Sequence, residues 1–462
     1  MRWVNLLSPQ KWSTTDKKNY LKQADYYDDY KQICTSHMVR QMQEKSHVFP
    51  LTEESNLNTG YTHSVETSAI AKLIGSNIVD ITIKTGKKTA LNEVAKSHIC
   101  ELLSCASMLH DVGNSPFGKF GEEAIRLWFK ANLNKIHFKD KPLTEVMSDQ
   151  MCGDFYCYSS ASRDLHCIFR YSRSDVTLTS SMLSALIIPC ESDKYKGLSQ
   201  SGYLYSERKE VQKLYESVEL SGQRHPLSYV VEAADKISLI TSVIENSVTA
   251  GMITCPQLMN ELRREDYFEE DIVQDEYQRF ASIVKYLGVC HNASKTRFTT
   301  NIETIAMQKW ITHVQDELIE FAAQSFVNNY EDIMRGVYLS NIFDDSWCRV
   351  MRNALKDVER KYTYNSEIMI SFKNGVNKII NFMLDTFINA VIYYDTDIEL
   401  CNSDRSFVTM IGEKYKKVYR RCSRDKDEIE KLYLRLIMVI DYICDMADEN
   451  LKDIYKKLNG IF

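Results

Sequence analysis

Residues 107–122 read Ser107-Met108-Leu109-His110-Asp111-Val112-Gly113-Asn114-Ser115-Pro116-Phe117-Gly118-Lys119-Phe120-Gly121-Glu122. A histidine and an aspartate stand next to each other at the end of an apolar helical pattern, directly before a turn rich in glycine and proline. Imidazole nitrogens and carboxylate oxygens are common ligands of divalent metal ions. The stretch therefore predicts that a helix delivers His110 and Asp111 to a metal centre at its C-terminal end.

Two further residues complete a candidate ligand set. His63 lies in the first turn of an expected helix, and Asp235 lies within an apolar helical pattern. An unpaired carboxylate is costly to bury among apolar neighbours, and a cation would offset that cost. Two imidazoles and two carboxylates also leave positions open for water and substrate. The pattern predicts a metal-dependent hydrolase of phosphate esters; in the alternative, Asp111 and Asp235 only cap helices or pair with lysines.

Composition limits the fold and the location of the protein. The 462 residues include only 16 glycines and 7 prolines, so we expect a mostly helical, all-α fold. The net charge of −6 gives no general reason to expect nucleic-acid binding. No apolar run reaches the roughly 18 residues that cross a bilayer, and the first nine residues are too short an apolar stretch for a signal peptide. The 13 cysteines show no paired C-x-x-C framework, so we expect reduced thiols in the cytoplasm and no membrane segment.

Three segments are expected along the chain. Residues 1–60 form an N-terminal helical segment, residues 61–250 form the metal-hydrolase core, and residues 251–462 form a helical region for regulation or oligomerisation. Within the core, apolar residues recur at helical spacing, and we expect helices over 61–80, 93–110, 122–132 and 227–250, a loop over 81–92 and an irregular insertion over 134–226. The C-terminal region has polar breaks near 288–303 and 400–408.

At these residues the chain resembles the HD superfamily of metal phosphohydrolases and, more narrowly, the bacterial deoxyguanosine triphosphate triphosphohydrolases. The likeness runs nearly end to end, through residues 40–51, 62–66, 110–129, 225–238, 321–326 and 441–448. It implies an HD-domain helical fold that hydrolyses a deoxynucleoside triphosphate to deoxynucleoside and tripolyphosphate, in a homo-oligomer that is often a hexamer. It also implies that a divalent ion, Mg²⁺ or Mn²⁺ or another transition metal, is held by His63, His110, Asp111 and Asp235. Glu122 would be the catalytic carboxylate.

The chain departs from the family pattern where the family contacts its substrate. Gly60 stands where the family has an arginine that meets phosphate, and Lys119 stands where it has a catalytic histidine. His47 replaces a glutamine that reads the sugar, Leu239 replaces an aromatic residue and Val243 an acidic one. The ligand set is thus retained while the substrate contacts differ. We expect dGTP or another dNTP as substrate, but these differences argue against assuming dGTP and indicate another nucleotide, another binding pose or weakened turnover.

Two residues after the Pro-Phe turn are candidates for the chemistry. Glu122 follows Lys119 by three residues, so one helical turn brings both side chains to one face. If burial lowers the pKa of Lys119 toward neutral, its ammonium could protonate the leaving 5′-oxygen or stabilise charge on the phosphates. In the alternative, Lys119 is a surface lysine paired with Glu122 or Glu123.

Substrate binding is assigned to four residues, namely Arg40, His47, Asn114 and Tyr203. Further cations that could meet phosphate are Lys84, Lys87, Lys88 and Lys194, each of which is otherwise a solvated surface charge. Tyr203 and Tyr205 could stack on a base, or pack in the core.

Two other functions stay open. One is an HD phosphohydrolase that acts on another nucleotide or on a single-stranded DNA end. The other is a degraded enzyme that senses a nucleotide and controls a partner. A nucleotide or single-stranded DNA effector would bind at subunit interfaces, and the setting would be control of nucleotide pools or antiviral defence against phage.

Overall fold

The computed structural model describes residues 1–12, 26–50, 57–86, 91–171, 177–188, 202–264, 274–297, 300–343 and 346–461. Helices dominate these residues, which confirms the expected all-α fold. The strands found there are β1 (His137–Phe138) and β2 (Lys141–Pro142), which pair as a short antiparallel hairpin. No helix in the described ranges is both long enough and apolar enough to cross a bilayer.

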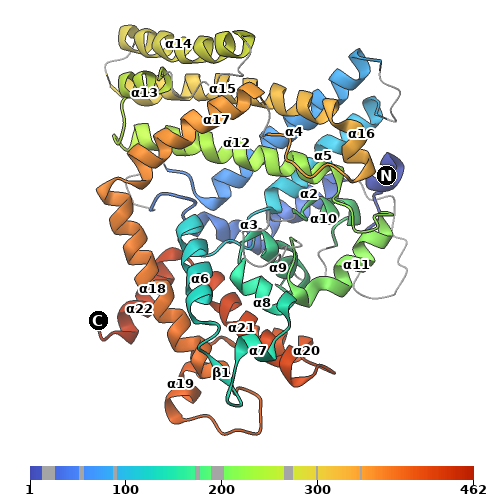
Figure 1. The fold of residues 1–462 in the computed structure, drawn as a ribbon, viewed down its shortest axis with the longest axis vertical. Helices are drawn as coiled ribbons and strands as arrows, with labels where there is room; N and C mark the ends of the chain where they lie inside the picture. The colour runs from blue at the N-terminus through green and yellow to red at the C-terminus, as the bar shows by residue number, and fades with distance from the viewer. Residues whose placement is uncertain are drawn as a thin grey trace.

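One group of helices is built around α4 (Gly60–Lys84), and most of it lies in the upper half of Figure 1. This helix packs against α5 (Glu93–Leu109), α12 (Pro226–Thr249) and α15 (Ile302–Asn328). The other members are α1 (Trp3–Leu6), α2 (Tyr26–Thr35), α3 (His37–Gln41), η1 (Met42–Glu44), α9 (Asp164–Tyr171), α10 (Ser180–Ala185), α11 (Arg208–Ser217), α13 (Cys255–Leu262), α14 (Gln274–Arg297), α16 (Tyr330–Arg335) and α17 (Ser346–Val358).

A second group lies in the lower half of Figure 1, around α6 (Gly118–Asn132) and α18 (Glu367–Val391), which pack against each other. Its other elements are the hairpin, α7 (Leu143–Val146), α8 (Asp149–Tyr156), η2 (Ala161–Arg163), η3 (Tyr205–Glu207), η5 (Glu359–Tyr364), α19 (Asn402–Met410), α20 (Glu413–Cys422), α21 (Glu428–Cys444) and α22 (Asp448–Leu458).

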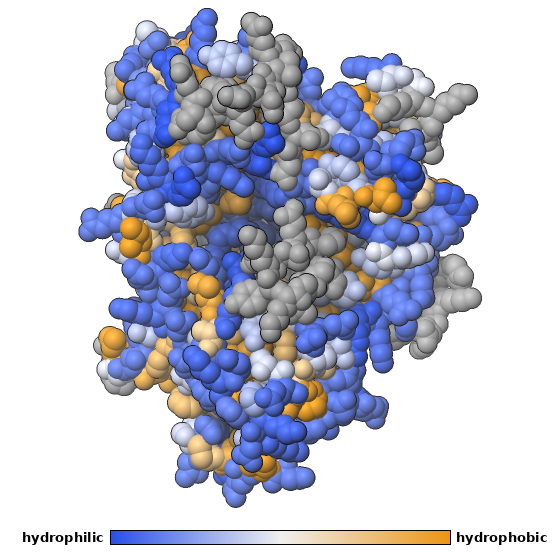
Figure 2. All heavy atoms as spheres, in the orientation of Figure 1, coloured by the Kyte–Doolittle hydropathy of each residue, from blue (hydrophilic) through white to orange (hydrophobic). Residues whose placement is uncertain are grey.

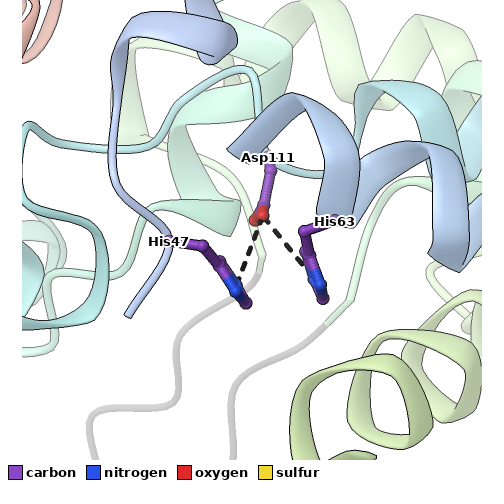
Figure 3. Close-up of side chains that lie close together, drawn as sticks. All are labelled: His47, His63 and Asp111. Atoms are coloured by element: carbon purple, nitrogen blue, oxygen red, sulfur yellow. Dashed lines mark ion pairs between the residues drawn. The ribbon is translucent and has the colours of Figure 1, made fainter. Parts of the chain in front are cut away.

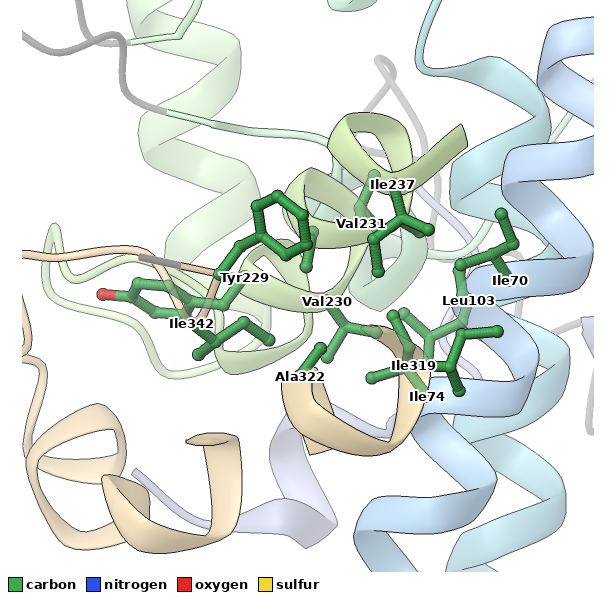
Figure 4. Packing of buried hydrophobic residues seen from close by; sticks show 14 of the residues in the cluster. Ile70, Ile74, Leu103, Tyr229, Val230, Val231, Ile237, Ile319, Ala322 and Ile342 are labelled. Carbon is green, nitrogen blue, oxygen red and sulfur yellow. The ribbon is translucent and has the colours of Figure 1, made fainter. Parts of the chain in front are cut away.

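The first group is held together by branched aliphatic side chains at helical spacing. Ile70 and Ile74 of α4 meet Leu103 of α5 and Val230 of α12 in the core shown in Figure 4. Gly75 permits the close approach of α4 and α5, because a Cβ atom there would lie 2.4 Å from Leu103 Cδ1. α4 begins at a capping box in which Thr59 and Thr62 each satisfy the backbone N–H of the other. The result is a rigid platform at the start of α4.

Two buried hydrophobic clusters fill the molecule. The first cluster contains side chains from several helices between Trp3 and Val358. The second cluster contains Val48, Phe49 and side chains of α6, α8 and the helices from α18 onward. The described residues on the face shown in Figure 2 are mostly hydrophilic, and hydrophobic ones gather there only in small groups. The division into three segments stays a prediction. The candidate site lies where the two clusters meet, because α4, α5 and α12 belong to the first and α6 to the second.

Several element boundaries differ from the sequence predictions. The predicted helix start at Glu122 is wrong, since the turn is completed by Phe117 and Gly118 at positive φ and α6 begins at Gly118. The predicted polar break near 400–408 is wrong, because Cys401 caps α19 and Val408 packs in the second cluster. The expected loop over 81–92 is shorter, since α4 continues to Lys84. The polar break predicted near 288–303 is shorter, since α14 continues to Arg297 and α15 begins at Ile302. The irregular insertion predicted over 134–226 contains short helices and the hairpin.

Candidate metal centre

Four side chains from three separate stretches converge at the junction of the two clusters. His63 lies in the first turn of α4, and Asp235 lies midway along α12. His110 caps the C-terminus of α5, and Asp111 follows it. His63 Nε2 lies 3.0 Å from Asp235 Oδ1 and 3.8 Å from Asp111 Oδ2. His110 Nε2 lies 3.5 Å from Asp235 Oδ1 and 3.8 Å from Asp111 Oδ2. The predicted ligand atoms are thus brought together.

The outer nitrogens of both histidines are fixed by hydrogen bonds. His110 Nδ1 lies 2.6 Å from the Ser107 carbonyl oxygen, and His63 Nδ1 lies 3.1 Å from Ser238 Oγ. A carbonyl oxygen can only accept, so Nδ1 of His110 carries the proton and donates it. When a metal ion replaces the proton on Nε2, the Nε2 lone pair is directed at the cluster, which is the arrangement that metal-binding histidines use.

The site fits a divalent metal ion. Nε2 of His110 and Oδ2 of Asp111 are buried and have no hydrogen-bond partner within the described residues, which is costly unless a further group meets them. Ligands bound at about 2.1 Å stand roughly 3 to 4.2 Å apart, and the four interatomic distances lie between 3.0 and 3.8 Å. His63, His110 and Asp235 together could hold such an ion.

Charge coupling within the cluster is strong. Burial alone would raise the pKa of Asp235, but contacts with His110 and His63 and the nearby Lys119 hold it well below its usual range. Burial alone would lower the pKa of His110, but Asp111 and Asp235 outweigh it and raise the pKa to about 9. Negative charge therefore dominates at this position and attracts cations.

His47 lies at the same centre, as Figure 3 shows. Its ring stacks on that of His63, with centroids 3.7 Å apart and planes 17° apart, and its Nε2 lies 4.0 Å from Asp111 Oδ2. Burial first, and then the neighbouring His63 and Lys119, hold the pKa of His47 well below its ordinary value. His47 is therefore a neutral imidazole with a free lone pair at neutral pH.

Lys119 interacts electrostatically with the carboxylates of the centre. Burial alone would lower its pKa, but Asp235, Glu122 and Asp111 outweigh burial and raise the pKa. The expectation of a pKa lowered toward neutral is therefore wrong, because several carboxylates surround the ammonium. Glu122 lies on the same face of α6, where it accepts the Ser160 backbone N–H at 3.1 Å.

The other predicted substrate-binding residues are placed differently. Asn114 is buried in the turn after Asp111, and its carbonyl oxygen accepts Lys45 Nζ at 2.8 Å. Arg40 is exposed in the last turn of α3, and Lys84 is exposed at the end of α4.

Tyr203 is half-buried against the first cluster. Tyr205 carries the guanidinium of Arg208 on its ring and contacts Tyr433. Lys87, Lys88 and Lys194 lie outside the described residues.

Three positions that depart from the family pattern serve packing. Gly60 opens α4 and donates its N–H to the Lys45 carbonyl oxygen at 3.1 Å, and a Cβ atom there would lie 3.3 Å from the Met42 carbonyl oxygen. Val243 is 1% exposed in the second cluster, and Leu239 packs against that cluster.

A buried polar network behind the centre was missed by the sequence analysis. Arg163 donates to the Gly113 carbonyl oxygen at 2.7 Å and to Asp441 Oδ1 at 2.8 Å, while Asp164 accepts the Gly113 N–H at 2.8 Å. Lys45 Nζ donates to the Cys444 carbonyl oxygen at 2.7 Å. The turn after the His-Asp pair is thus held by η2, α9 and α21. The resemblance at residues 441–448 was a signal for these helices, but spacing does not reveal their contacts.

Comparison with known proteins identifies relatives of the whole chain. No family model matches the chain. The deoxyguanosinetriphosphate triphosphohydrolase-like protein of Listeria innocua is 33% identical over 482 aligned positions that span 100% of both proteins. Its counterpart in Listeria monocytogenes is 32% identical over the same extent. The chain belongs to the deoxyguanosinetriphosphate triphosphohydrolase-like family. The deoxyguanosinetriphosphate triphosphohydrolase of Serratia proteamaculans is 23% identical over 94% of this chain and 93% of its own length.

Membership of the triphosphohydrolase-like family explains why the likeness seen in the sequence extends from the N-terminal segment to α22. The aligned region covers both helix groups.

Proposed function

We propose that this protein hydrolyses a deoxynucleoside triphosphate, dGTP or another dNTP, to deoxynucleoside and tripolyphosphate with the help of a divalent metal ion. One observation carries the proposal: four ligand atoms, from His63, His110, Asp111 and Asp235, converge at a buried site where two of them have no other partner among the described residues. Relatives named deoxyguanosinetriphosphate triphosphohydrolase support the choice of substrate class.

The ion would supply Lewis acidity at the α-phosphate and lower the pKa of an attacking water. The protein must provide a proton or a positive charge for the leaving 5′-oxygen. Lys119 suits this role, since its raised pKa keeps it charged at neutral pH. A lysine with a raised pKa gives up its proton only to an oxygen of still higher pKa, such as an alkoxide. In this proposal Lys119 neutralises the leaving oxygen as it forms.

Glu122 is proposed as the catalytic carboxylate beside Lys119. The Ser160 backbone N–H and Arg126, whose Nη1 lies 3.3 Å from Glu122 Oε1, orient the side chain. A carboxylate held by two donors keeps one position relative to α6 and to the ammonium of Lys119. Arg40, His47, Asn114 and Tyr203 stay proposals as substrate-binding residues.

Assembly and control are proposed on the family resemblance alone. A homo-oligomer, such as a hexamer, would present the C-terminal helices at its interfaces to a nucleotide or single-stranded DNA effector. Nucleotide-pool control and defence against phage are the two settings that fit an enzyme that depletes dNTPs. Control by a nucleotide effector is tested by activity in the presence of mixed nucleotides. Assembly is tested by the mass of the protein in solution.

A second candidate function follows from the positions where the family contacts its substrate. Val243 and Leu239 contribute to packing, and Gly60 has no side chain to meet phosphate. These features favour an altered substrate, such as another nucleotide or a single-stranded DNA end, over a lost metal site.

A product screen tests both functions. The protein is incubated with each dNTP and rNTP, singly and mixed, with Mg²⁺ or Mn²⁺, and products are separated by anion exchange. Tripolyphosphate with free deoxynucleoside is the expected result. A single-stranded oligonucleotide is included in the screen; its degradation, or release of phosphate or pyrophosphate, would support the second candidate. Nucleotide binding without any product from nucleotides or oligonucleotide would contradict both and favour a sensor. Asp111→Ala serves as the inactive control.

A further inference from the structure

A cavity lined by basic side chains lies among α9, η3, α11, α20 and α21. Its volume is about 250 Å³, and none of the proposed metal ligands lines it. Five cationic side chains line the cavity, namely Arg170, Arg208, Lys209, Arg421 and Lys426. The lining also contains two carboxylates, those of Glu210 and Glu430. In a chain whose net charge is −6, this local excess of positive charge attracts anions.

Ion pairs within the lining leave part of the positive charge without a counter-charge. Two cations share the carboxylate of Glu430, which lies 2.8 Å from Arg208 Nη2 and 3.0 Å from Lys426 Nζ. Neither Arg421 nor Lys209 forms an ion pair with a carboxylate in the described ranges of the chain. Guanidinium and ammonium groups are the side chains that bind phosphate oxygens most strongly. The lining therefore suits a phosphorylated anion.

Two guanidinium groups of the cavity are held in place by the protein itself. Arg170 Nη2 lies 2.6 Å from Glu207 Oε2 and 3.0 Å from Glu210 Oε1. Arg208 lies over the ring of Tyr205, with its Cζ 3.5 Å from the ring centroid. Side chains that are already fixed lose little conformational entropy when a ligand binds. The cavity is thus a preformed site, and its geometry does not depend on a ligand to order it.

The size and the lining of the cavity favour a chain of phosphates over a nucleobase. Pockets for drug-sized ligands usually measure about 300 to 1,000 Å³, and this cavity is smaller. Its two tyrosines are already engaged, because Arg208 covers the Tyr205 ring and the Tyr433 hydroxyl donates to Asp154 Oδ2 at 2.5 Å. A chain of phosphates, in contrast, offers oxygens to several of the five cations at once.

We propose that this cavity binds a linear polyphosphate, either as the free anion or as the phosphate chain of a nucleotide whose base stays outside. The site is separate from the metal centre of the proposed hydrolysis. Arg421 and Lys209, the exposed cations without an ion pair among the described residues, would bind the chain directly. Arg170 and Arg208 would provide the fixed part of the site.

Binding is measured by calorimetry on the metal-free full chain, with tripolyphosphate, inorganic phosphate, dGTP and deoxyguanosine as probes. The variants are Arg421→Ala and Lys209→Ala, singly and together, because both side chains are exposed and their loss should leave the fold intact. Arg424→Ala is the matched control, since Arg424 is exposed just beyond α20 and does not line the cavity. We expect each single variant to bind tripolyphosphate roughly 10-fold more weakly, the usual effect of losing a hydrogen bond between charged groups. The double variant should lose more, and the control little.

The probes distinguish the two sources of the phosphate chain. Tighter binding of tripolyphosphate supports the free anion as ligand, and tighter binding of dGTP supports the nucleotide. Cavity variants that bind tripolyphosphate and dGTP as tightly as the wild type overturn the inference, as does a wild type that binds neither. Inorganic phosphate or deoxyguanosine binding as tightly as the phosphate chains would also overturn it. Because no turnover is measured, failure of the proposed hydrolysis would leave this result unaffected.

Discussion

Asp448 accepts the backbone N–H of Phe117 at 2.7 Å, although 331 residues separate the two in the sequence. The same carboxylate accepts the N–H of Ser46 at 2.9 Å and its hydroxyl at 2.5 Å. One side chain at the start of α22 therefore joins the two segments that carry His47 and Lys119. The C-terminal helices take part in building the candidate site as well as in packing the second cluster.

Asp448→Ala is expected to weaken both stability and activity. The substitution removes the acceptor of two backbone N–H groups and one hydroxyl. Each buried group that loses its partner costs about 1 to 3 kcal/mol. We expect the free energy of unfolding in urea to fall by about 3 kcal/mol and kcat to fall with it. Asp453→Ala, at an exposed position of the same helix, is the control. Equal stability of the two variants would contradict the bracing role.

Asp111→Ala separates metal binding from folding. In the metal-free chain Asp111 stabilises the protonated ring of His110, so its removal should lower the free energy of unfolding of the metal-free protein, and the test is therefore the response to metal. Metal should raise the Tm of the wild type by mass action and leave that of the variant unchanged. Turnover should be abolished. A variant that keeps metal-dependent Tm and full kcat would show that Asp111 is not a ligand.

The sequence could predict the proposed ligands because each lies in a short motif with local periodicity. His63, His110 and Asp235 all face inward from helices whose apolar spacing is visible in one dimension. The contact of Ser46 with Asp448 could not be predicted, since the two are 402 residues apart and no local pattern reports such a pair. The pKa of Lys119 could not be predicted either, because it depends on how many carboxylates from other elements surround the ammonium.

Lys119→Ala is expected to lower kcat more than it raises KM. The ammonium is proposed to meet charge that develops on the leaving oxygen, and an interaction made mainly in the transition state affects kcat and kcat/KM alike. We expect a loss of about 10²- to 10⁴-fold, which is the usual effect of removing a proton-transfer group. Lys135→Ala, just beyond the end of α6 and exposed, is the control. An unchanged kcat in steady-state assays would remove Lys119 from the chemistry.

His166 gives the folded protein a specific dependence on pH. The buried ring lies 2.9 Å from Asp441 and 2.7 Å from Glu207, and these carboxylates outweigh burial and raise its pKa from 6.5 to about 9. Between these values the folded chain holds a proton that the unfolded chain has released, so stability is complete below about pH 6.5 and falls as pH rises toward 9. The difference between the two pKa values corresponds to about 3 kcal/mol.

Urea unfolding at pH 6, 7.5 and 9, which lie about 3, 1.5 and 0 pH units below the folded pKa of about 9, checks this dependence. The wild type should lose stability across the series, while His166→Gln should start lower at pH 6 and lose much less. His98→Gln should follow the wild type, because His98 is exposed. The same slope in His166→Gln and in the wild type would show that another group carries the proton. Because Asp441 also holds Arg163 against Gly113, release of the His166 proton should loosen the turn after Asp111 at the same pH values.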